Sequence, residues 1–162
     1  MIQFTKKSRF GRTLLLAGIA LGASVVASAA FAGECPPDQK KPDAREPVTV
    51  GHDGVTDTVI AMIDLEKEPA NIKDTKFRMR RLTIEPNGTV PWHSHADRPD
   101  FIYIIEGEIN EYANNCAVPI VHKAGDVIAE THEVSHWWKN LGDKAVVLIS
   151  TDLLKDPNDK DM

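Results

Sequence analysis

The chain has 162 residues, of which 42% are hydrophobic and 27% charged, and its formal net charge at pH 7 is −5. This length and composition fit one ordinary domain with room for a hydrophobic core. The excess of acidic residues makes nucleic acid and anionic membranes poor partners, so those function classes are excluded from the expectation.

The first 32 residues are predicted to be an export signal. A basic segment at 6–12 precedes an apolar stretch at 14–26, and Ala30-Phe31-Ala32 is an A-x-A cleavage signal. The apolar stretch is too short and too rich in small residues for a membrane span, although an uncleaved anchor is the alternative. Cleavage after Ala32 would release a periplasmic or secreted protein with no stable membrane insertion. That protein holds 15 basic and 24 acidic residues, a net charge of −9.

The two cysteines are the next feature along the chain. Residues 33–46 are proline-rich and charged, which predicts an extended tail, and this tail contains Cys35. Cys116 lies in a predicted loop. An oxidising compartment favours a disulfide between the two cysteines, which would pin the tail to that loop. Two free thiols are the alternative. Thiolate ligation of a metal is not expected, because neither cysteine falls within a ligand motif.

Short strands are predicted throughout residues 47–155, before a polar tail at 156–162. The expected strands are 47–50, 58–64, 76–85, 101–105, 108–112, 118–122, 127–129, 136–139 and 145–151, with Leu153 and Leu154 in a short cap. The apolar parity changes between Met79 and Leu82, which predicts a bulge near Arg80 and Arg81. Pro86-Asn87-Gly88 predicts a turn. Many short strands without a convincing helix are typical of a β-sandwich or barrel.

A histidine pair lies between Gly88 and Gly107. His93 and His95 are two residues apart, so in an extended strand both imidazoles project from the same face. Proline then interrupts the strand and a β-branched, aromatic run follows. If the chain returns antiparallel, Asp100 lies near the histidines as a third, anionic ligand, and Asp97 is a competing carboxylate. A plain hairpin with two ordinary histidines and a solvated aspartate is the alternative.

A second stretch, from Gly125 to Asn140, repeats this layout, and the two stretches together resemble the two motifs of the cupin family. The matching residues are His93, His95, Asp100 and Gly107 in the first motif, and Gly125, His136 and Asn140 in the second. The resemblance covers the middle third of the chain. It implies a single all-β domain, the double-stranded β-helix or jelly-roll barrel. It also implies a metal site made of His93, His95, Asp100 and His136.

The chain departs from the cupin pattern at several positions. Four residues rather than five separate Gly88 from His93, and the carboxylate is Asp100 rather than a glutamate. Thr131 and Glu133 stand where the family has proline and glycine. These departures leave the predicted metal site in place but put the role of the carboxylate in doubt.

The predicted ligands determine which metals and reactions to expect. Three imidazoles and one carboxylate suit one divalent Fe, Mn, Ni, Cu or Zn ion and leave coordination positions open. The resemblance implies a metal-dependent enzyme acting on a small organic substrate, most often a non-haem dioxygenase and otherwise a lyase, isomerase or decarboxylase. A non-catalytic module that binds a metal, sugar or small acid is the alternative, which the departures favour. A chain that acquires its ion outside the cytosol meets conditions that favour Cu and Zn.

Further residues are candidates for the pocket. The loop before His136 carries Glu130, His132 and Glu133, which are candidate acid–base groups, and Tyr103 is a candidate for the pocket wall. Trp138 has the same parity as His136 and should point inward.

The remaining aromatic and imidazole side chains are expected outside the pocket. Trp92 and Trp137 have the opposite parity, which places them on the outside or between subunits. His52 and His122 lie outside both motifs and are expected at the surface. The resemblance implies a homodimer paired through sheet faces.

Overall fold

The computed structural model describes residues 33–155, so the predicted leader and the tail at 156–162 lie outside the described residues. The described chain is built of antiparallel strands, and its only helix is a short 3-10 turn, η1 (Pro37–Gln39). The predicted all-β fold is confirmed. In this part of the chain no helix has the length and hydropathy needed to cross a bilayer.

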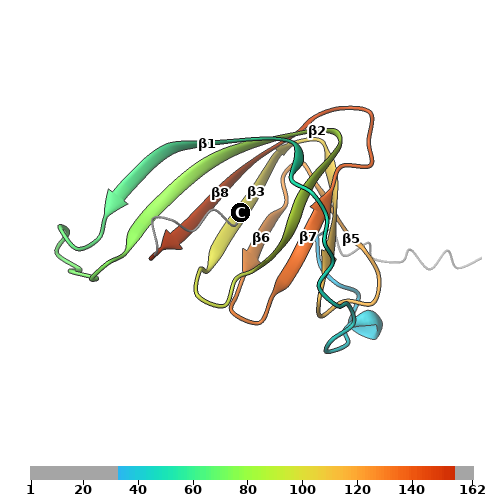
Figure 1. Cartoon of the computed structure of the whole chain (residues 1–162), viewed down its shortest axis with the longest axis horizontal. Coiled ribbons are helices and arrows are strands. Elements are labelled where there is room, and N and C mark those ends of the chain that lie inside the picture. The colour runs from blue at the N-terminus through green and yellow to red at the C-terminus, as the bar shows by residue number, and fades with distance from the viewer. Residues whose placement is uncertain (1–32, 156–162) are drawn as a thin grey trace, which may run out of the picture.

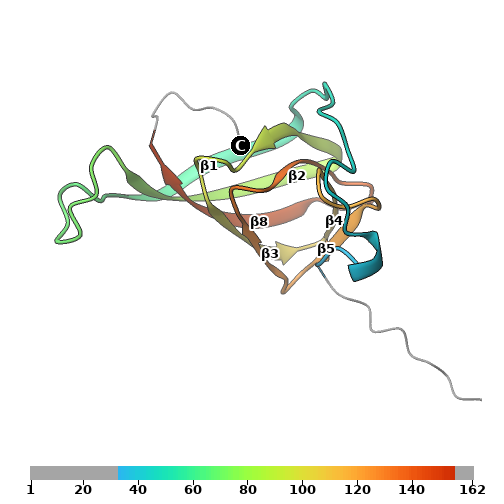
Figure 2. The ribbon, with the colours of Figure 1, turned by 90° about the horizontal axis from the view of Figure 1, so that it is seen from below.

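Eight strands form one curled sheet. They are β1 (Asp53–Asp64), β2 (Lys76–Ser94), β3 (Asp100–Glu106), β4 (Glu108–Ala113), β5 (Ile120–Lys123), β6 (Val127–Glu130), β7 (Ser135–Lys139) and β8 (Val146–Leu154). The order across the sheet is β5-β4-β7-β2-β8-β3-β6, and β1 pairs with β2. The sheet bends into a half-barrel (Figure 1), and the loop between β1 and β2 projects beyond it, as the view from below shows (Figure 2).

The longest strand, β2, belongs to both halves of this curl. Its first part pairs with β1 and β8, and its last part pairs with β7. Between the two parts, Asn87 has a φ of 64°. A Cβ on Gly88 would lie 2.8 Å from the carbonyl oxygen of Glu85, so only glycine fits there. The predicted turn at 86–88 is therefore a bend within one strand.

Asn140 holds this bend in place. Its side chain is fully buried, and its Nδ2 donates hydrogen bonds to the carbonyl oxygens of Ile84 at 2.9 Å, Glu85 at 3.1 Å and Lys144 at 2.8 Å. Buried carbonyl groups need such partners. The asparagine of the second motif therefore has a structural role.

Alternating side chains of the strands fill the inside of the curl. In β3, for example, Ile102 and Ile104 are buried while Phe101 and Tyr103 are exposed. The main apolar cluster consists of Leu82, Ile84, Val90, Ile102, Ile104, Ile109, Ile128, Trp138, Val146 and Leu148. This cluster supports the strands that carry the histidines.

Several predicted strand details are wrong. Residues 47–50 are not a strand, and residues 153–154 continue β8 instead of forming a cap. The irregularity near Arg80 lies in β1, between Val59 and Ala61, whereas β2 pairs with β8 in an unbroken register. The apolar residues change from odd to even positions because the inward position 80 is occupied by Arg80, which binds the carboxylate of Asp57, while Met79 lies on the outer face.

The predicted disulfide is present. Cys35 and Cys116 are joined with their Cα atoms 5.8 Å apart. Both sulfurs are buried in a small apolar cluster with Ala113 and Ile120. The bond fixes the N-terminal tail against the loop between β4 and β5.

Candidate metal centre

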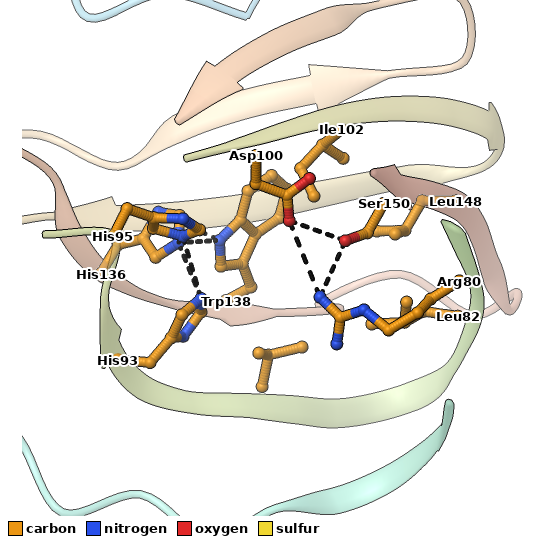
Figure 3. Close-up of a pocket in the computed structure, with 11 residues that line it drawn as sticks. Arg80, Leu82, His93, His95, Asp100, Ile102, His136, Trp138, Leu148 and Ser150 are labelled. Atoms are coloured by element: carbon orange, nitrogen blue, oxygen red, sulfur yellow. Dashed lines mark hydrogen bonds and ion pairs between the residues drawn. The ribbon is translucent and has the colours of Figure 1, made fainter. Parts of the chain in front are cut away.

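Three histidines meet inside the half-barrel. His93 lies near the end of β2, His95 just beyond it, and His136 is the direct cross-strand partner of His93 on β7. Their Nε2 atoms face one another (Figure 3). The separations are 3.1 Å for His93 and His95, 3.0 Å for His95 and His136, and 3.2 Å for His93 and His136. The structure thus brings together the three imidazoles that the sequence singled out, and all three are buried.

The other nitrogen of each ring has a partner of its own. Nδ1 lies 2.9 Å from the carbonyl oxygen of Pro91 in His93, 3.0 Å from that of Arg98 in His95, and 2.6 Å from Oε1 of Glu111 in His136. Each partner can only accept, so each Nδ1 carries the hydrogen. The three Nε2 lone pairs therefore point at one another, which is the arrangement of second-sphere hydrogen bonds typical of metal-binding histidines.

The spacing of the Nε2 atoms fits an ion. Histidine nitrogens bind transition metals at about 2.0–2.1 Å, so ligands at right angles would lie about 2.9 Å apart and tetrahedral ligands about 3.3 Å apart. The observed separations of 3.0–3.2 Å lie between these two values. Three ligands on one face of an ion leave its opposite positions open.

The buried rings differ in charge. Burial, with repulsion from His136, lowers the pKa of His93 well below its usual value and that of His95 to about 4. Burial opposes a charge on His136 as well, but the carboxylates of Glu130 and Glu111 raise its pKa. Without an ion, His136 is therefore the ring of the three that binds a proton most readily.

Glu111 was missed by the sequence analysis, and His122 was misplaced. Glu111 bridges two imidazoles, accepting from Nδ1 of His136 and, at 2.7 Å, from Nε2 of His122. Although burial opposes its charge, these bonds hold its pKa at about 2. His122 is fully buried and stacks on Trp138, so its predicted surface position is wrong. Glu111 is two residues from the buried Ile109, and His122 is two residues from the buried Ile120. Strand alternation could therefore have predicted that both side chains point inward.

The fourth predicted ligand, Asp100, does not join the cluster. Its Oδ2 accepts a hydrogen bond from Oγ of Ser150 at 2.7 Å, and its Oδ1 accepts one from the backbone N–H of Thr151 at 2.9 Å. Arg80 lies 3.7 Å from the same carboxylate. Because β3 pairs with β8, the carboxylate faces β8 and not the imidazoles (Figure 3). Asp97, the competing carboxylate, is exposed.

Of the other predicted pocket residues, Glu130 lies at the imidazole cluster and the rest do not. Glu130 is buried beside the cluster, with Oε2 3.7 Å from Nδ1 of His136, and burial raises its pKa to about 8. The side chains of His132 and Glu133 are 76% and 78% exposed. Tyr103 is exposed on the outer face of β3, so it does not line the pocket.

The three tryptophans are partly as predicted. Trp138 is buried and forms one wall of the pocket, as predicted. Trp137 is half-buried and stacks on Tyr112, with ring centroids 4.1 Å apart. Trp92 is also half-buried.

Beyond Asp100, the barrel contains a charge-balanced cluster that includes three arginines and three aspartates. Arg78 forms a two-pronged bond with Asp152 at 2.6 and 3.0 Å, Arg80 binds Asp57 at 2.8 Å, and Arg98 lies 3.7 Å from Asp152. Of these residues, Arg80 and Asp100 line the pocket, and their opposite charges give it little preference for an anion.

A small cavity separates the imidazoles from Arg80 and Ser150, walled by apolar side chains such as Leu82 and Leu148 (Figure 3). Its volume, counted as space open to the centres of water molecules, is about 30 Å³. One water needs about 10–15 Å³ on that measure, so the cavity holds about two waters. A second cavity, of about 410 Å³, is lined by His95, Asp97, Thr131 and His132.

The comparisons with known proteins agree with this geometry. The family model described as a cupin domain matches residues 80–152. This segment is a cupin domain. It contains all three histidines, Glu111, the strands β3 and β7, and all but the last two residues of β8. No curated protein matches the chain in sequence.

Solved structures with the cupin fold are similar in shape but distant in sequence. An uncharacterised Klebsiella pneumoniae protein with a double-stranded β-helix domain is 17% identical, with a TM-score of 0.51, over 67% of this chain and 84% of that one. The cupin domain of Schizosaccharomyces pombe Cnp3 is 18% identical, with a TM-score of 0.49, over 64% and 66%. An oxalate oxidase bound to glycolate is 19% identical, with a TM-score of 0.49, over 65% and 54%. The match thus spans less than two thirds of the last two chains, and such identities establish the fold alone.

Proposed function

We propose that this protein is an exported, metal-dependent enzyme that acts on a small organic substrate, with dioxygenation as its reaction. The observation that carries the proposal is the set of three Nε2 lone pairs, held 3.0–3.2 Å apart by bonds to Nδ1 and bordering a cavity. Catalytic metal sites keep three protein ligands and an open position, whereas structural sites close all four. His93, His95 and His136 would hold the ion.

The ion, when bound, supplies Lewis acidity and an open site for oxygen or a chelating substrate. The protein's own residues orient that site. Glu111 fixes the tautomer of His136, and Trp138 with the apolar walls keeps bulk water out. Because the small cavity takes only about two water-sized groups, a substrate would place its coordinating atoms there. The 410 Å³ cavity, which His95 also lines, has room for the rest of it.

The same features bear on the alternative, a non-catalytic module that binds a metal, sugar or small acid. Because Arg80 is paired with Asp57 and Asp100, the pocket has little preference for a small acid. A module that only binds a metal ion does not require open coordination positions on that ion facing a cavity. These observations support the enzyme.

Export is part of the proposal. The predicted leader supports a periplasmic or secreted location, and the disulfide between Cys35 and Cys116 fits an oxidising compartment. In that setting the site would be loaded with iron, or with zinc or copper, which bind such donors more tightly.

The test has two steps. Elemental analysis of protein purified from its own periplasm should find about one transition ion per chain. Oxygen uptake with phenols and diketones should then depend on that ion, and on Fe(II) in reconstituted protein. His93→Ala should abolish turnover and ion binding while keeping the circular dichroism spectrum, whereas His52→Ala, at an exposed position, should change neither. Ligand-dependent thermal shifts without product under every ion would replace the enzyme with the binding module.

A further inference from the structure

Behind the candidate metal centre, one buried nitrogen, Nδ1 of His122, accepts no hydrogen bond from any of residues 33–155. His122 donates through Nε2 to Glu111, so its Nδ1 carries a lone pair. That Nδ1 is buried and has no hydrogen-bond partner among residues 33–155. A buried acceptor without a donor costs about 1–3 kcal/mol.

Gly33 lies directly against this nitrogen. A Cβ built on Gly33 would be 3.2 Å from Nδ1 of His122 and 3.3 Å from Oδ2 of Asp126. Gly33 has a φ of 79°, which favours glycine, and the disulfide at Cys35 holds this part of the tail in place. The position that a side chain would take at residue 33 is therefore within hydrogen-bonding distance of an acceptor and a carboxylate.

The sequence independently predicts cleavage between Ala32 and Gly33. Cleavage would turn the amide nitrogen of Gly33 into an ammonium group with three hydrogens and a positive charge. In a terminal glycine, rotation about the Cα–C bond can move the nitrogen into the position of either hydrogen on Cα, including the one that a Cβ would replace. The ammonium nitrogen can therefore occupy the site whose neighbours are His122 and Asp126.

We propose that removal of the leader completes the metal centre: the new ammonium group of Gly33 donates a hydrogen bond to Nδ1 of His122 and forms an ion pair with Asp126. The hydrogen-bonded series then runs from Gly33 through His122 and Glu111 to His136, a predicted metal ligand. Export and processing would thereby strengthen ion binding in the mature protein relative to its precursor.

The test compares three disulfide-bonded proteins. One begins at Gly33, one has a single alanine before Gly33, and one begins at Gly33 and carries Asp126→Asn. In metal-free protein, NMR titration should show that Asp126 raises the pKa of the Gly33 ammonium above the usual value of about 7.7–8.0. Asp126→Asn should return it to that range.

Zinc affinity is the second measurement. The extra alanine should weaken zinc binding by about threefold to tenfold, less than the 10–100-fold effect of losing a direct partner of a ligand. The proposal is overturned if the ammonium titrates at its usual value, if the extra alanine leaves zinc affinity unchanged, or if mass spectrometry of the exported protein finds a terminus other than Gly33. The NMR titration needs neither metal nor substrate, so its outcome is independent of the proposed enzyme activity.

Discussion

Replacing Glu111 by glutamine tests the arrangement of the three histidines most directly. Both carboxylate oxygens of Glu111 accept a hydrogen bond, from Nδ1 of His136 at 2.6 Å and from Nε2 of His122 at 2.7 Å. A glutamine keeps the shape but has one accepting oxygen and one NH₂ group. One of the two imidazoles must therefore meet a donor with its own N–H.

The consequence for ion binding can be estimated. If His136 is the ring that meets the NH₂ group, it is driven toward the tautomer with hydrogen on Nε2, the nitrogen that faces the other two histidines. Loss of such a partner usually costs 10–100-fold in metal affinity, or about 1.4–2.7 kcal/mol. We expect zinc and Fe(II) to bind Glu111→Gln within that range more weakly than wild type.

A competition titration with a coloured chelator measures this affinity. Glu108→Gln is the matched control, because Glu108 is on the same strand and its side chain is 56% exposed. Circular dichroism confirms that both variants keep the fold. A folded Glu111→Gln protein with the affinity of wild type would contradict this prediction and would mean that the glutamine oxygen, and not its NH₂ group, faces His136.

Three further predictions concern protons and the tail. Ion binding should release more protons as the pH is lowered toward the raised pKa of His136, whereas His93 and His95 release none at neutral pH because burial lowers their pKa; calorimetry in buffers of different ionisation enthalpy at several pH values measures the release. Burial raises the pKa of Glu130 to about 8, so between about pH 5 and pH 8 the unfolded chain binds fewer protons than the folded one. The free energy of unfolding of the metal-free protein should therefore fall over this range, by up to about 1.4 kcal/mol per pH unit. Urea unfolding of Glu130→Gln should lack this slope. Cys116→Ser, which opens a loop of 81 residues, should lower the free energy of unfolding by about 2–4 kcal/mol, and an unchanged urea midpoint would contradict the tail's stabilising role.

The sequence predicted the fold and the three histidines because both depend on local patterns. Alternation of apolar residues, turn residues and the two-residue spacing of His93 and His95 can be recognised without knowing what lies across the sheet. His136 came from the repeated motif, and the structure pairs it directly with His93. The disulfide was predictable from the compartment that the leader predicts and from the number of cysteines.

The parts that could not be predicted depend on partners far along the chain. Asp100 faces Ser150 on β8, fifty residues away, and no local feature shows that this hydroxyl is there. Arg80 looked like an interruption of an apolar strand because its partner Asp57 is on β1. Glu111 and His122 are polar residues at inward positions, and a reading that places polar residues outside assigns them to the surface.

The continuous course of β2 has a consequence for assembly. A single strand contributes Arg80 to one half of the curl and His93 to the other. His93 and His95 lie at the end of β2 or just beyond it and His136 lies on β7, so a bound ion would link two strands whose histidines are up to 43 residues apart in the chain. Metal loading should accordingly slow global unfolding rather than merely stiffen one hairpin.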